Sequence, residues 1–259
     1  MNLDDLINIL PENYVFKVAD AKPKLINWKE ICKEFKLSED FIERHLDDVN
    51  WTYISRYQKL SEEFIEKYKD YVNWEEISLR QKLSEEFIDK YKNFLYLTDV
   101  FKHQKFSEQF IEKYKYWVSW KVISEYQKLS ESFIEKHADK VNWIAVSRYQ
   151  KLSEKFIEKH ADKVDWEYIS EFQQLSEPFI EKFKNKVDWD KISEYQKLSE
   201  QFIVKHKDEV NWKYISEYQQ LSESFIEKHA DKVDWNNIFE YQKLSPKFKE
   251  KFKDKLRNN

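Results

Sequence analysis

Apolar side chains in this chain recur at the three- and four-residue spacing of amphipathic helices. In the segment KLSESFIEKHADKVNWIAVSRYQ, Phe133, Ile134 and Val141 form one apolar stripe, and Trp143 and Val146 begin a second one. Side chains at i, i+3, i+4 and i+7 lie on one face of a helix, whereas a strand requires strict alternation. The segment is therefore predicted to hold two short helices, each with one apolar face.

The residues just before the two stripes are of the types that favour the start of a helix. Ser130 precedes the first stripe and Asn142 precedes the second. Both residue types accept hydrogen bonds from the free backbone N–H groups of a first helical turn. Leu129 and Ile134 flank the first cap at the spacing of a hydrophobic staple, which fixes how the chain enters the helix. These signals predict a helical hairpin whose turns need no glycine.

The hairpin pattern repeats every 23 residues. With its tryptophan as position 1, the unit reads W-x-x-I-S-x-Y-Q-K-L-S-E-x-F-I-E-K-H-x-D-x-V-N/D. Such a period indicates an array whose units bury their apolar stripes against each other. A leucine-rich repeat has a similar period, but no unit shows its L-x-x-L-x-L alternation. Leu97 takes position 1 in one unit, and the tryptophans at position 1 are Trp28, Trp51, Trp74, Trp120, Trp143, Trp166, Trp189, Trp212 and Trp235.

We therefore predict an all-α fold, a superhelical αα-hairpin solenoid of ten helix-turn-helix units over residues 28–257. Residues 1–27 contain LPENYVF, an echo of LSEEFIE, and are predicted to form a degenerate N-terminal cap. The last unit, residues 235–257, has Lys249 where the other nine units have isoleucine. It is predicted to act as the C-terminal cap, because the outer face of a terminal repeat meets water.

Composition narrows the class of protein. Hydrophobic residues make up 41% and aromatic residues 17% of the 259-residue chain, too much for a disordered protein. The 45 basic and 49 acidic side chains give a net charge of −4, which argues against a polyanion mimic or a polybasic arm. Cys32 is the only cysteine, so no internal disulfide can form. The sequence has no signal-peptide layout and no membrane-length apolar run, so we expect a soluble, intracellular protein.

Several recurring polar residues are interpreted as structural. Glutamine at position 8, as in Gln150, is predicted to form a hydrogen-bond ladder or loop tie between units. Serine at position 5, as in Ser147, is predicted to let neighbouring helices approach, and it has no histidine or acid companion that would make it a nucleophile. The sequence has no glycine-rich phosphate loop and no cleft-forming pair of acids, so we expect no enzymatic activity and no cofactor.

The histidines are also interpreted as structural. Five of the six lie at position 18, as His137 and His160 do, and Tyr68 or Phe183 fills that position in other units. A position shared with phenylalanine calls for a flat ring in a packed interface. Adjacent units would hold these rings roughly 8–10 Å apart, too far to share one ion, so no metal site is predicted.

Candidate binding residues are those that differ between units, because repeat proteins present variable positions on a common surface. Position 21 is lysine in most later units but aromatic in three consecutive ones, where Tyr71, Phe94 and Trp117 are predicted to form an exposed aromatic stripe. Tyr96 and Tyr116 lie near its end. Variable positions of the first helix add further apolar candidates: Tyr53, Leu79, Val122, Ile144, Tyr168 and Tyr214.

The consensus breaks in residues 79–119. Leu97 replaces tryptophan, Phe101 replaces serine and His103 replaces tyrosine. One interpretation is that Phe101 and Trp117 fill the void left by the missing tryptophan. The other is that the aromatic residues form a binding hot spot. The stripe begins at Tyr71, before the irregularity, which favours the second interpretation for that residue.

The units WEYISEFQQLSEPFIEKFKNKVD and WKYISEYQQLSESFIEKHADKVD resemble the 23-residue tandem repeats of uncharacterised proteins in giant DNA viruses and large phages. The resemblance covers residues 28–257 and rests on W-x-x-I-S together with L-S-E-x-F-I. It implies a viral origin and, with it, a location in the host cytoplasm. It implies no activity and no site.

Our leading hypothesis is a non-enzymatic scaffold that binds a protein partner, with a host or defence factor as a candidate. The partner would contact the variable first-helix positions and the aromatic stripe. One alternative is a nucleic-acid-binding solenoid, although the acidic residues Glu171, Glu194 and Glu217 at position 6 oppose it. Another is self-assembly, in which the stripe would turn a monomer into a dimer.

Overall fold

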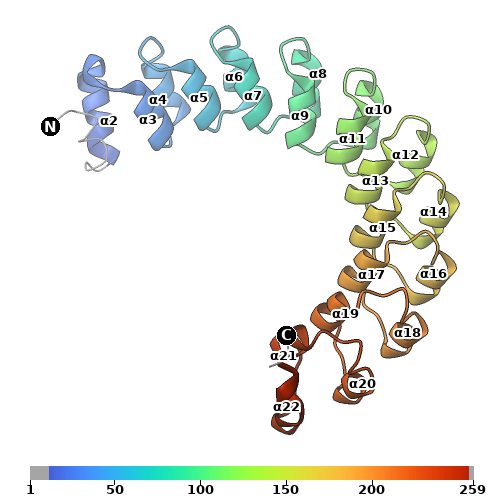
Figure 1. Ribbon diagram of the computed structural model, residues 1–259. Helices are drawn as coiled ribbons and strands as arrows, with labels where there is room; N and C mark the ends of the chain where they lie inside the picture. The colour runs from blue at the N-terminus through green and yellow to red at the C-terminus, as the bar shows by residue number, and fades with distance from the viewer. Residues whose placement is uncertain (1–11, 257–259) are drawn as a thin grey trace. The chain divides into compact units, whose positions relative to one another are not determined.

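The computed structural model describes residues 12–256, and every regular element in this range is a helix (Figure 1). The all-α prediction is confirmed, as is the hairpin repeat. Each of the ten units contributes a first helix that starts at position 1 and a second helix that starts at position 12. The last unit follows the same register, with Pro246 instead of glutamate at position 12.

The first helices are α3 (Trp28–Glu34), α5 (Trp51–Tyr57), α7 (Trp74–Arg80), α9 (Leu97–His103), α11 (Trp120–Tyr126), α13 (Trp143–Tyr149), α15 (Trp166–Phe172), α17 (Trp189–Tyr195), α19 (Trp212–Tyr218) and α21 (Trp235–Tyr241). The second helices are α4 (Glu39–Arg44), α6 (Glu62–Lys67), α8 (Glu85–Tyr91), α10 (Glu108–Tyr114), α12 (Glu131–Lys136), α14 (Glu154–Lys159), α16 (Glu177–Lys182), α18 (Glu200–Lys205), α20 (Glu223–Lys228) and α22 (Pro246–Phe252). The array is flanked by α2 (Glu12–Ala21) with the 3-10 turn η1 (Pro23–Leu25), and by the 3-10 turn η2 (Lys253–Leu256).

Capping side chains define these short helices. Ser130 Oγ accepts a hydrogen bond from the backbone N–H of Phe133 at 3.2 Å, and Asn73 Oδ1 accepts one from Glu76 at 3.1 Å. A helix of six or seven residues is marginal on its own, so each cap contributes a large share of its local stability. No described residue has a positive φ angle, which accounts for a chain that folds without glycine.

Two aliphatic side chains in nearly every unit, isoleucine in most of them, form the centre of the core. Ile169 at position 4 and Ile180 at position 15 have no accessible surface, and their counterparts are equally buried in every unit except at position 15 of the last one. Burying one such side chain stabilises the fold by about 1.5–3 kcal/mol. The last unit has Lys249 at position 15, and this lysine is exposed.

Glutamine and serine tie neighbouring helices together. Gln173 Oε1 accepts from the backbone N–H of Leu152, and its Nε2 donates to the carbonyls of Ser147 and Gln150, all within 3.0 Å. The predicted glutamine ladder is thus confirmed. Position-5 serine does more than save space, because Ser147 Oγ also accepts from the backbone N–H of Asp165 at 2.9 Å.

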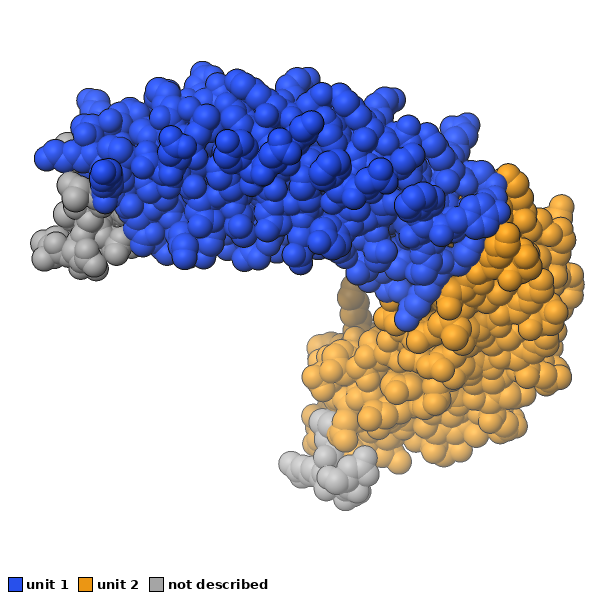
Figure 2. Space-filling model, turned by 90° about the horizontal axis from the view of Figure 1, so that it is seen from above, with its two compact units in different colours: residues 1–128 blue, residues 129–259 orange. Residues whose placement is uncertain are grey.

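The helices form two compact halves of the array, residues 1–128 and residues 129–259 (Figure 2). Within each half, the first helices of consecutive repeat units pack directly against one another. In the second half, residues 129–259, the row of first helices from α13 to α21 lies on the inner side of the curve of that half (Figure 1).

The predicted N-terminal cap is described only in part, because residues 1–11 lie outside the described residues. The remainder packs on the first repeat: the ring of Phe16 lies 4.8 Å from that of Phe41, and Asp20 Oδ1 lies 2.9 Å from His45 Nε2. Residue 257, the end of the predicted C-terminal cap, also lies outside the described range.

Candidate functional site

The predicted aromatic stripe is exposed to solvent. Tyr71, Phe94 and Trp117 show 61%, 50% and 61% of their surface, in the turn that follows the second helix of their units. Most large aromatic side chains of a soluble protein are largely buried. Three consecutive units therefore present an apolar ring at the same point of the repeat.

Tyr71 and Phe94 take over a contact that other units make with lysine, whereas the unit of Trp117 has Leu97 in place of the tryptophan. The ring of Tyr71 lies 5.4 Å from that of Trp51 in its own unit. In a consensus unit the ammonium group of Lys163 lies over Trp143 instead, 5.7 Å from the ring centroid. Position 21 thus contacts the position-1 tryptophan ring in both cases. The aromatic residue keeps this contact and replaces a charged surface by an apolar one.

The fourth unit separates the two interpretations of the irregular region. Phe101 is fully buried, and its ring lies 6.2 Å from Phe110 and 6.4 Å from Tyr114, the partners that tryptophan has in other units. Phe101 therefore fills the space that is empty in this unit because Leu97 replaces the larger tryptophan. The predicted void-filling role of Trp117 is wrong, because a ring with 61% of its surface exposed is not core.

Tyr96 occupies the N-cap position of α9, where most units have asparagine or aspartate. Its side chain makes no capping hydrogen bond and is 54% exposed. Tyr116, next to Trp117, is also exposed, with the ammonium group of Lys115 over its ring at 5.2 Å. One end of the fourth unit thus gives up a helix cap and gains exposed aromatic surface.

The six other predicted residues do not join the stripe. They lie on six different first helices, and among them only Ile144 is exposed. Tyr168 and Tyr214 are half-buried against position-7 rings of their own helices, at 6.0 Å and 6.2 Å. The remaining three are also half-buried: Tyr53, Leu79 and Val122.

A second aromatic row, at position 7, was missed by the sequence reasoning. Its five consecutive members in the second half of the array, residues 129–259, are about half exposed: Tyr149, Phe172, Tyr195, Tyr218 and Tyr241. The signal was the near-constant aromatic residue at position 7, which a search for variable positions passes over. A side-chain hydrogen bond to Glu217 raises the pKa of Tyr218 to about 12.

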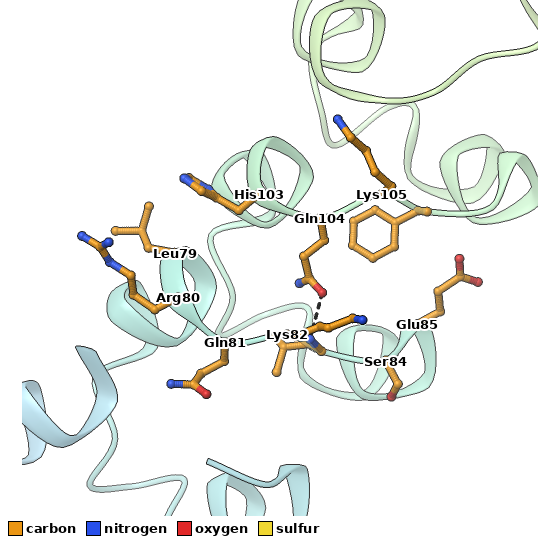
Figure 3. A pocket seen from close by; sticks show the side chains of 11 residues that line it. Leu79, Arg80, Gln81, Lys82, Ser84, Glu85, His103, Gln104 and Lys105 are labelled. Carbon is orange, nitrogen blue, oxygen red and sulfur yellow. Dashed lines mark hydrogen bonds between the residues drawn. The ribbon is translucent and has the colours of Figure 1, made fainter. Parts of the chain in front are cut away.

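A hollow of about 820 Å³ opens between the third and fourth units, where α7 and α9 end (Figure 3). Its lining includes four basic side chains, Arg80, Lys82, His103 and Lys105, and one acid, Glu85. Arg80 and His103 replace position-7 aromatic rings and project to the same side (Figure 3). The hollow lies at the opposite end of the hairpins from the stripe and forms a separate surface.

The glutamine ladder is incomplete at this hollow. Gln104 Oε1 accepts from Leu83 at 2.9 Å, but its buried Nε2 has no partner among the described residues. Two charged groups of the rim are already engaged: Lys105 donates to the carbonyl of Tyr126, and Glu85 accepts from Ser107 at 2.8 Å. The hollow is therefore a polar gap in the repeat packing, with a basic rim.

Histidine at position 18 is a packed ring, as predicted. The ring of His206 lies 4.8 Å from Trp189 and 4.5 Å from Phe202. In residues 12–256 no three His, Cys, Asp or Glu side chains cluster in a way that could hold a metal ion.

Burial raises the pKa of the Cys32 thiol to about 11, which disfavours the reactive thiolate. Nor does the described part contain a helix with the length and apolarity needed to cross a membrane.

Comparison with known proteins identifies no relative. No family model, no curated protein and no solved structure matches the chain. An argument about function therefore starts from the surface of the molecule itself.

Proposed function

We propose that this protein is a non-enzymatic scaffold that binds a protein partner through the stripe of Tyr71, Phe94 and Trp117. The observation that carries the proposal is the replacement of a charged position by exposed aromatic rings in three consecutive units and nowhere else in the array. Aromatic residues dominate the binding energy of many protein interfaces, so a contiguous row of them marks a surface for a partner.

The constant parts of the repeat supply a contrast. The position-7 row follows the period of the array and recurs in seven of the ten units, which fits a role in the repeat packing. The stripe departs from the period. A departure that exposes apolar surface does not serve the packing of the unit, because lysine covers the same tryptophan in other units.

The lost helix cap at Tyr96 supports the same proposal. An N-cap side chain contributes about 1 kcal/mol to stability, and α9 forgoes this contribution while presenting an exposed ring beside the stripe. Stability given up in favour of exposed aromatic surface is a common property of binding sites. The resemblance to viral repeats makes host proteins the first candidates for the partner.

The experiment is an affinity capture from candidate host lysate with three forms of the full chain, read by mass spectrometry. The stripe variant carries Tyr71→Lys, Phe94→Lys and Trp117→Lys. The matched control carries Tyr195→Lys, Tyr218→Lys and Tyr241→Lys, which are three similarly exposed rings of the position-7 row. Circular dichroism establishes that both variants remain helical, and calorimetry with the purified partner gives the affinities.

We expect wild type and control to capture the same partner and the stripe variant to lose it. Each stripe ring should contribute about 2 kcal/mol, or roughly 30-fold in Kd. Capture lost only in the control would move the site to the position-7 row and overturn the proposal. A stripe-dependent dimer in light scattering, with no captured partner, would make the stripe a self-assembly surface instead.

A further inference from the structure

Neighbouring units are joined by a carboxylate that two donors share. Glu181 at position 16 of one unit receives Lys205 Nζ at 2.8 Å and His206 Nε2 at 2.6 Å from the next unit, both on Oε2. Glu135 receives the same pair of donors from the unit that follows it. Positions 17 and 18 thus form a receptor for one carboxylate group, and the preceding unit supplies that group.

One unit lacks the carboxylate but keeps both donors. Position 16 is an acid in nine of the ten units and is Val204 in the remaining one. The donors of the next unit, Lys228 and His229, are those of the consensus. Valine offers them no acceptor, and the buried Nε2 of His229 has no hydrogen-bond partner among the described residues.

The vacated place is a hollow that reaches the surface. It measures about 460 Å³, and its lining includes Val204, Phe225, Lys228 and His229. Val204 is 37% exposed, so its methyl groups border the hollow where the stem of a glutamate lies in other units. The His229 ring packs against two aromatic rings, that of Phe225 at 4.6 Å and that of Trp212 at 5.4 Å.

The one acid in the lining is already engaged. Glu200 Oε1 accepts a hydrogen bond from the backbone N–H of Ser222 at 2.6 Å, as position-12 glutamates do for the next unit throughout the array. It therefore does not replace the missing group at His229. The two donors and the apolar wall fit a carboxylate on a short aliphatic stem, because that is the group bound at the matching places in the same protein.

We propose that the hollow beside His229 is a carboxylate-binding site that receives an acidic side chain of a bound protein partner. The stem of the side chain packs on Val204, and its carboxylate accepts hydrogen bonds from Lys228 and His229. Only the source of the carboxylate rests on the proposed protein-binding function. The affinity for a carboxylate follows from the Lys228 ammonium group and from His229 Nε2, which lacks a partner among the described residues.

Binding would be visible on the imidazole itself. Burial is the main cause that lowers the pKa of His229, and the charge of Lys228 adds to it. A carboxylate at Nε2 favours the protonated ring and acts in the opposite direction. The histidine NMR signals of the full chain therefore report directly on occupancy, with His229 assigned through its loss in His229→Asn.

The test titrates the full chain with sodium acetate and with the blocked peptide acetyl-Ala-Glu-Ala-amide. Acetyl-Ala-Gln-Ala-amide and sodium chloride at equal ionic strength are the controls. We expect both carboxylates, and neither control, to shift the His229 signal and raise its pKa. Val204→Glu restores the consensus acid, whose carboxylate should occupy Lys228 and His229 itself. The response to an added carboxylate should then weaken by about tenfold or more, because that carboxylate loses a charge-assisted hydrogen bond. Val204→Leu, of similar size but without an acceptor, should keep it.

Absence of a His229 response to either carboxylate would overturn the proposal, and so would an unchanged response in Val204→Glu. A response to acetate but not to the glutamate peptide would mean that the site takes small free carboxylates and no partner side chain. These titrations need no partner and do not involve the stripe at residues 71–117. Their failure can therefore be told apart from failure of the proposed function.

Discussion

His206 and Glu181 lie in consecutive units, and their side chains meet with Nε2 of the ring 2.6 Å from Oε2 of the carboxylate. The histidine is buried, whereas the glutamate is about one-third exposed. The contact therefore joins a packed aromatic stack to the charged surface of the preceding unit. His160 makes the same contact with Glu135, at 2.7 Å, so a histidine at position 18 can be a packed ring and a link between units at once.

This contact makes the stability of the array sensitive to acid. Hydrogen bonds from Lys205 and His206 lower the pKa of Glu181 from 4.5 to about 2. Between these values the unfolded chain binds the proton and the folded chain does not, so the stabilisation is complete above pH 4.5 and is lost as the pH falls through about 2. Glu181→Gln should lower the free energy of unfolding at pH 7, and the difference from wild type should shrink toward pH 2. Urea denaturation at several pH values measures it.

Glu158→Gln is the matched control for this prediction. Glu158 also bonds to the position-17 lysine of the next unit, Lys182, but the ring that follows is Phe183. Removal of its charge should therefore cost less than removal of the charge of Glu181. A difference between Glu181→Gln and wild type that stays the same from pH 6 to pH 2 would show that the contact does not act through the carboxylate charge.

The glutamine ladder provides a second test of how the units are joined. Gln173→Leu removes the partners of one backbone N–H and two carbonyl groups, and the loss should lower the free energy of unfolding by about 3 kcal/mol. Among the described residues the Gln104 side chain bonds only to the backbone N–H of Leu83, so Gln104→Leu should cost about 1 kcal/mol. Denaturation midpoints of the two variants decide. Equal losses would mean that the carbonyl bonds contribute nothing.

The repeat architecture could be predicted because its causes are local. The 23-residue period, Ser130 and Asn142 as caps, and the apolar spacing act within one hairpin, and each survives in the structure. Contacts between units were harder to foresee. The shared carboxylate at Glu181 and the hydrogen bond from the backbone N–H of Asp165 to Ser147 Oγ join residues that are 18 to 25 positions apart. No periodic pattern within a helix reveals the geometry of such contacts.

The candidate surface was predictable for a different reason. An exposed stripe follows from the position of Tyr71, Phe94 and Trp117 in the repeat, since copies of one position lie on one side of the array. The hollow beside Arg80 was not predictable, because it arises where a ladder bond of Gln104 fails to form. Such a gap is a property of packing that the sequence of a single unit does not show.

The missing cap at Tyr96 can be restored. Tyr96→Asn supplies the side chain that caps the first helix in units such as that of Asn73, and it should raise the free energy of unfolding by about 1 kcal/mol. The same change should weaken partner binding if the exposed ring belongs to the interface. Chemical denaturation and calorimetry measure the two effects. A variant no more stable than wild type would show that the cap was not lost at this position.

Phe101 and Leu97 are predicted to be energetically coupled. Phe101 takes the ring space that tryptophan occupies in other units, where Trp74 stacks on Tyr91 at 5.4 Å. Phe101→Ser alone should leave a cavity and cost about 3–5 kcal/mol. Leu97→Trp alone should overpack the same space and cost about 1–3 kcal/mol.

The double variant restores the consensus pair, so the new tryptophan should fill the cavity that the serine leaves. We expect a coupling energy of about 1–3 kcal/mol in favour of the pair, measured by urea denaturation of the four proteins of the cycle. Losses that add to within about 0.5 kcal/mol would mean that the two side chains do not share one space. Trp117→Ala is the control: an exposed ring outside this core should change stability by no more than about 0.5 kcal/mol, which leaves it available for a partner.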